Sequence, residues 1–175
     1  MSSGGGGPQG GRARGAEAAG SGGAEQGPAG GTEAAVEQPV GVVSEQPVGI
    51  DELLERVRAG YRRVDVPEAH EAARTGAALL VDIRYAALRE RDGVIPGALV
   101  IERNELEWRL DPQGSHRTPE ATGHDLRIVV ICNEGYASSL AVASLHQLGL
   151  RRATDLVGGF QAWRAAGLPV EPVRS

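Results

Sequence analysis

The segment ICNEGYASS, residues 131–139, holds the side chains of this chain best suited to covalent chemistry. It contains Cys132, the only cysteine among 175 residues, and a glycine three positions later. A cysteine directly after an apolar run is often a buried core residue. A cysteine at the start of a glycine-containing loop before a helix instead lies among unpaired backbone N–H groups, which favour a nucleophilic thiolate. The loop that follows Cys132 favours the second interpretation.

The same loop predicts a small anion-binding nest. Gly135 allows backbone conformations that other residues avoid, so successive N–H groups can converge. Ser138 or Ser139 is a candidate cap for the following helix. Glu134 should face solvent, since its carboxylate would oppose a thiolate. Because no Lys or Arg follows Cys132 within the loop, nothing would hold a phosphate dianion bidentately, and we expect no phosphatase activity.

The elements around the loop predict an α/β fold. Strands are expected at 61–66, 77–83, 98–101, 126–131 and 153–157, and helices at 50–60, 67–76, 84–92, 104–110, 138–148 and 159–166. Apolar strands that alternate with helices are typical of a parallel sheet flanked by helices on both faces. Ligands bind beyond the carboxyl ends of such strands. Cys132 and Arg84 each follow a strand, so we expect them at the same edge of the sheet.

Composition divides the chain near residue 50. Half of the 26 glycines lie before residue 32, so we expect a disordered arm over residues 1–49 and one domain over 50–175.

The net charge of −5 and the scattered arginines argue against nucleic-acid binding. No apolar run has the length of a membrane span or signal core, so we expect a cytoplasmic protein without a membrane partner. The four histidines share no ligand spacing, so we expect neither a metal nor a cofactor.

Five segments, taken together, resemble the rhodanese-like single-domain family. They are LLVDIR, DGVIPGA, ICNEGYASS, LHQLGL and DLVGGFQAWRAAGLPV, and the resemblance spans residues 62–170. It implies a sulfurtransferase in which Cys132 accepts a sulfane sulfur as a persulfide, from a small-molecule or protein donor, and passes it to a thiol or cyanide. It also implies that loop N–H groups hold the outer sulfur, namely those of Asn133, Glu134, Gly135, Tyr136 and Ala137.

This sequence departs from the family pattern inside the loop. Many relatives have an arginine where Ala137 stands, which assists anionic donors such as thiosulfate, so its absence counts against thiosulfate turnover but not against persulfide formation. Glu134 and Tyr136 make the loop less cationic than in many relatives, which points to a less charged donor or a protein partner. At the end of the strand expected over 77–83, Asp82 and Arg84 can form an ion pair that orients the loop or caps the sheet edge, or Arg84 can attract an anionic donor. Ser138 is expected to support the loop.

Two other functions remain open for a chain with this loop. The fold can serve as a binding or regulatory module that moves little sulfur, or Cys132 can sense oxidants through a sulfenic acid. Because the chain has one cysteine, a persulfide on it would have to pass to another molecule.

Overall fold

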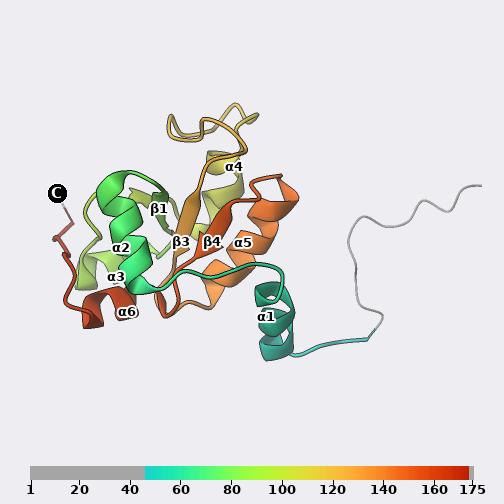
Figure 1. Ribbon diagram of the computed structural model, residues 1–175, viewed down its shortest axis with the longest axis horizontal. Coiled ribbons are helices and arrows are strands. Elements are labelled where there is room, and N and C mark those ends of the chain that lie inside the picture. The colour runs from blue at the N-terminus through green and yellow to red at the C-terminus, as the bar shows by residue number, and fades with distance from the viewer. Residues whose placement is uncertain (1–45, 174–175) are drawn as a thin grey trace, which may run out of the picture. The chain divides into compact units, whose positions relative to one another are not determined.

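The computed structural model describes residues 46–173, so the arm expected over residues 1–49 lies almost entirely outside the described part, and the boundary at residue 50 stays a prediction. The described residues form a four-stranded parallel sheet in the order β2-β1-β3-β4 (Figure 1). Its strands are β1 (Leu79–Asp82), β2 (Leu99–Val100), β3 (Ile128–Ile131) and β4 (Ala153–Asp155). The expected α/β fold is confirmed.

Helices connect the strands. They are α1 (Ile50–Arg58), α2 (Val66–Thr75), α3 (Ala86–Asp92), the 3-10 turn η1 (Arg103–Glu105), α4 (Leu106–Leu110), α5 (Ala137–Gln147) and α6 (Gly159–Ala165). Local signals set their ends: Asp65 accepts a hydrogen bond from the Glu68 N–H at the start of α2, and Gly76 ends this helix with a φ of 69°. None of the helices in the described part is long and apolar enough to cross a membrane.

Both faces of the sheet are buried, as the continuous apolar run of β3 predicts. Ile128 and Val130 pack with α4 and α5 on one face, and Val129 and Ile131 pack with α6 on the other. Phe160 and Trp163 of α6 are core residues. In Figure 1, α4 and α5 lie on one side of the sheet and α2 and α6 on the other. This packing fixes the carboxyl end of β3, where Cys132 follows.

The strand expected over residues 61–66 is wrong. Only Val64 pairs with the sheet, in a single parallel bridge to Leu156 beside β4. Asp65, one residue later, already caps α2, so the chain leaves the sheet after one bridge. Before the bridge, Tyr61 and Arg63 instead donate hydrogen bonds to Asp155 at the end of β4.

Candidate active site

Cys132 directly follows β3, and its side chain is held in a short chain of hydrogen bonds. The Gly135 N–H donates to its Sγ at 3.0 Å, and the thiol donates to Ser138 Oγ at 3.2 Å. Ser138 Oγ donates in turn to Asp155 Oδ2 at 2.7 Å. Cys132 is 6% exposed and also packs against the α5 side of the core. Both interpretations of this cysteine therefore describe part of its environment, but its polar contacts go beyond those of a core residue.

A hollow of about 280 Å³ opens above the sulfur. Its lining comes from the ends of β1 and β3, η1, α3 and the cysteine loop, and consists of Ile83, Arg84, Tyr85, Leu88, Arg103, Cys132, Asn133, Glu134, Tyr136 and Ala137. Cys132 and Arg84 thus share one edge of the sheet, as expected, because β1 and β3 are paired neighbours. Glu134 is exposed, also as expected.

The loop itself leaves backbone donors available. The N–H groups of Glu134, Tyr136 and Ala137 have no protein acceptor within residues 46–173. Gly135 has a φ of 84°, and a Cβ at this position would lie 2.9 Å from the Gly158 nitrogen. Only glycine fits such a conformation at such a close approach. The arrangement can therefore bind a small anion or a polarisable sulfur near Cys132.

The helix cap predicted from the two serines is wrong. Tyr136 is the N-cap residue of α5 and makes no side-chain cap bond. Ser138 and Ser139 both donate to Asp155 Oδ2, at 2.7 and 3.0 Å. The helix begins at Ala137, so both serines lie inside its first turn rather than at the cap, and their hydroxyls donate to the buried carboxylate. Ser138 supports the loop through this carboxylate.

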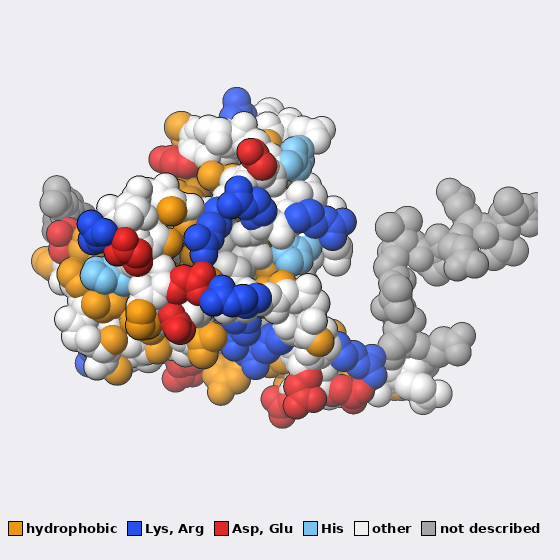
Figure 2. All heavy atoms as spheres, viewed as in Figure 1, with side chains coloured by type: hydrophobic (Ala, Val, Ile, Leu, Met, Phe, Trp, Pro, Cys, Tyr) orange, Lys and Arg blue, Asp and Glu red, His pale blue; other side chains and the backbone are white. Residues whose placement is uncertain are grey.

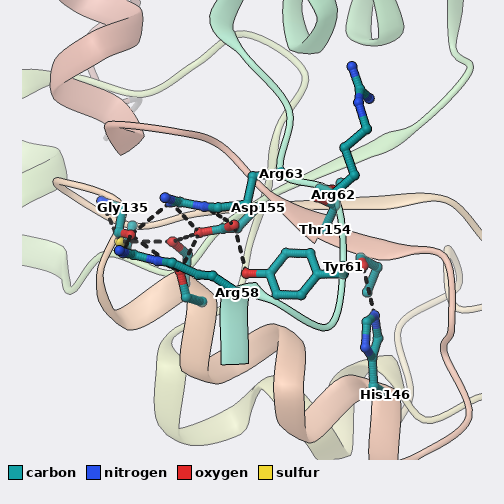
Figure 3. A network of polar contacts seen from close by, with 12 residues as sticks. Arg58, Tyr61, Arg62, Arg63, Gly135, His146, Thr154 and Asp155 are labelled. Atoms are coloured by element: carbon teal, nitrogen blue, oxygen red, sulfur yellow. Dashed lines mark hydrogen bonds and ion pairs between the residues drawn. The ribbon is translucent and has the colours of Figure 1, made fainter. Parts of the chain in front are cut away.

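Asp155, at the end of β4, is the centre of a buried polar network (Figure 3). Arg63 donates to both of its oxygens, at 2.8 and 2.9 Å, and Tyr61 Oη donates to Oδ1 at 2.9 Å. Burial disfavours the charge on Arg63, but the hydrogen bonds to Asp155 outweigh it and raise the Arg63 pKa. Burial, together with the Asp155 carboxylate, raises the pKa of Tyr61 to about 12. Both donors therefore keep their protons at neutral pH.

Two arginines of this region converge on one carbonyl of the cysteine loop. Arg58 Nη2 and Arg63 Nη2 donate to Gly135 O at 2.7 and 2.9 Å, and Arg58 Nε donates to Ser139 Oγ at 3.0 Å. In Figure 3 both guanidinium groups point to Gly135, whereas Arg62 points away. Sequence reasoning missed these arginines because they lie more than 70 residues from the loop. The one available signal was Asp155, a charged residue at the end of a short buried strand.

Asp82 and Arg84 form the buried ion pair that their spacing allowed. Arg84 Nη2 donates to Asp82 Oδ2 at 2.6 Å and to Gly93 O at 2.8 Å, with both side chains 0% exposed. The guanidinium carbon lies 3.5 Å from the centre of the Phe160 ring. This geometry fits a structural pair at the sheet edge. A contact of Arg84 with a sulfur donor stays a prediction.

A second group of arginines lies outside this site. Arg62, Arg127, Arg151 and Arg152, scattered in sequence, line one hollow at the amino ends of β3 and β4. Figure 2 shows arginine side chains gathered on this face. Glu68 accepts from both Arg62 and Arg127, and these hydrogen bonds lower its pKa. Because Cys132 lies at the opposite end of β3, these charges do not line the hollow above its sulfur.

No three His, Cys, Asp or Glu side chains among residues 46–173 are placed to hold a metal ion. The sulfur, the loop amides and the Asp155 network are therefore the chemical groups that this site offers.

Comparison with known proteins agrees with this geometry. Residues 65–166 match the profile of the rhodanese-like domain. The chain is 38% identical over 98 residues to a sulfurtransferase of Allochromatium vinosum, covering 56% of this chain and 82% of that protein. It is 27% identical over 111 residues to the thiosulfate sulfurtransferase GlpE of Vibrio cholerae, covering 63% and 95%. A Rhodopseudomonas palustris structure of unknown function, described as a possible tyrosine phosphatase, superposes with a TM-score of 0.65 at 33% identity, covering 75% and 100%.

The profile match covers more than half of the chain, with Cys132 at the end of the central strand. The protein belongs to the rhodanese-like domain family.

Proposed function

We propose that the protein is a sulfurtransferase that carries a sulfane sulfur as a persulfide on Cys132. The observation that supports this most directly is the position of Sγ, which accepts the Gly135 N–H at 3.0 Å beneath an open hollow. A reactive thiol needs both a stabilised thiolate and access for a second sulfur. The named sulfurtransferases among its relatives add family support.

The reaction has two balanced steps and needs no cofactor. The Cys132 thiolate attacks the sulfane sulfur of the donor, so a bond from Sγ to sulfur forms and the donor leaves with the electron pair of its broken bond. An external thiolate or cyanide then attacks the outer sulfur, which releases the Cys132 thiolate again. The free N–H groups of the loop can hold the outer sulfur while it bears negative charge.

The hollow favours a weakly charged donor, or a persulfide presented by a protein. Its two arginines already have carboxylate partners, since Arg84 pairs with Asp82 and Arg103 pairs with Glu107. At the rim, Tyr85 and Tyr136 are 61% and 57% exposed. The loop of this chain has no basic side chain that could hold a phosphate group. This argues against phosphatase activity in this protein, the role suggested for the R. palustris relative. A reducing compartment such as the cytoplasm suits a functional free thiol.

Intact-mass spectrometry tests the proposal. The purified protein is incubated with thiosulfate or with a cysteine persulfide donor, beside a Cys132→Ser variant. We expect the persulfide donor to add one sulfur atom that cyanide removes, with no gain in the variant. If neither donor adds a sulfur to a thiol shown to be free, the proposal is wrong.

The exposed tyrosines favour one alternative, a module that binds a partner through the rim of the hollow. Under this alternative Cys132→Ser leaves partner binding unchanged, whereas a sulfur carrier loses its transfer activity. The same variant therefore separates the two functions.

A further inference from the structure

The segment just before the rhodanese-like domain reaches into the active site. The family match begins at residue 65, whereas Arg58, Tyr61 and Arg63 precede it. The helix α1, which ends at Arg58, packs against α5, the helix that follows the cysteine loop. The contacts of Arg58 and Arg63 with Gly135 therefore connect a segment outside the matched domain to the loop around Cys132.

Charge distinguishes the two arginines. Arg63 is neutralised by Asp155, to which it donates twice. Arg58 forms no ion pair with a carboxylate among the described residues; besides Gly135 O and Ser139 Oγ it contacts only the Tyr136 ring, 5.7 Å from the ring centre. The two guanidinium groups and one carboxylate leave a net positive charge behind the loop. Neither arginine lines the hollow above the sulfur.

The contact also fixes the direction of a peptide group. Every peptide bond in the described chain is trans, so the Tyr136 N–H points away from the side on which Gly135 O lies. Because Arg58 and Arg63 hold Gly135 O on their side, the Tyr136 N–H is turned from them and stays free of protein acceptors. A flip of this peptide would point the carbonyl oxygen, a negative group, to where the donor now lies.

We propose that Arg58 is a positioning residue of the active site, which holds the Gly135–Tyr136 peptide and supplies the positive charge that the loop itself lacks at Ala137. It acts on the Cys132 thiolate through the peptide without touching the sulfur. This inference rests on the proposed function for its biological meaning, but its effect on the thiolate is measurable without any sulfur transfer.

The test compares Arg58→Met with Arg56→Met. Arg56 lies on the same helix, but its side chain is 51% exposed and pairs with Glu52, so it controls for any change to α1. Iodoacetamide alkylates the thiolate, and its rate at pH 7 reports how strongly the loop stabilises that form. Losing one charge-assisted hydrogen bond should slow alkylation about tenfold in Arg58→Met and leave Arg56→Met unchanged. At pH 10, where most thiols are ionised, the two variants should differ less than about twofold.

Arg58→Lys and thermal melting keep the test decisive. The lysine retains the charge and one donor, so its alkylation rate should stay within about threefold of the wild type. A rate in Arg58→Met equal to that of Arg56→Met, whether or not the melting temperature falls, would overturn the inference. So would a folded Arg58→Lys as slow as Arg58→Met. A wild-type protein that gains no sulfur while these alkylation differences persist would refute the proposed function alone.

Discussion

Replacing Asp155 with asparagine should destabilise the domain by about 3 kcal/mol. The side chain is fully buried and accepts five hydrogen bonds, two from Arg63 and one each from Tyr61, Ser138 and Ser139. An amide keeps the shape but has one accepting oxygen, so at least two donors lose their acceptor.

The size of the loss follows from Arg63. Removing one partner of a buried ion pair costs about 3–5 kcal/mol, because the other charge stays buried without compensation. The Arg63 side chain is 17% exposed and keeps its bond to Gly135 O, which places the loss at the lower end. A domain of ordinary stability has about 5–15 kcal/mol in all, so the variant should still fold.

Urea unfolding, followed by tryptophan fluorescence, measures this free energy. Glu71→Gln is the matched control, since Glu71 pairs with Arg74 but the two side chains are 60% and 64% exposed; its loss should stay below about 1 kcal/mol. The slope of the free energy against urea should not change. If Asp155→Asn costs no more than this surface pair, the network is not the stabilising centre that its geometry indicates.

Three other outcomes are expected. The pKa of Tyr61 is raised to about 12 in the folded protein from an unfolded value of 10. Tyr61 therefore contributes its full stabilisation below pH 10, and this contribution is lost as pH rises through 12. Thermal melts at pH 9–12 should show that the melting temperature of Tyr61→Phe falls less steeply with pH than that of the wild type. Gly76→Ala, with a φ of 69° and open space, should cost about 1 kcal/mol in urea, and Gly135→Ala clearly more, since its Cβ would meet backbone at 2.9 Å. Ala137→Arg should increase sulfur loading from thiosulfate, as mass spectrometry can show, because it adds the missing cation to the loop.

The sheet and the cysteine loop could be predicted because their signals are local. Four consecutive apolar residues form β3, and the glycine-containing loop and a helix follow it directly. The ends of α2 could also be predicted, since its bounds of Val66–Thr75 lie within one residue of the range expected over 67–76. The position of Cys132 and Arg84 at one edge followed from the topology alone, since parallel neighbours end together.

The polar network could not be predicted in the same way. Arg63 and Asp155 are 92 residues apart, and nothing near either residue indicates its partner. The serine cap failed because the helix begins one residue earlier than expected, at Ala137, so Ser138 lies inside its first turn and donates to a carboxylate 17 residues away. Local preference gives way wherever a buried charge must be satisfied.

Two buried Asp–Arg pairs flank β3, the strand that ends before Cys132, and they differ in what they hold. Asp82 and Asp155 end the strands on either side of β3. Besides Asp82, Arg84 donates to Gly93 O and lies over the Phe160 ring, and neither of these residues belongs to the cysteine loop. Besides Asp155, Arg63 donates to Gly135 O, which belongs to the loop around the sulfur. The first pair therefore stabilises the sheet edge, whereas the second connects the stability of the fold to the geometry of the loop. That second connection begins before the matched domain, so a chain cut at residue 65 would keep Cys132 and lose Arg58 and Arg63, the two side chains that donate to Gly135 O of its loop.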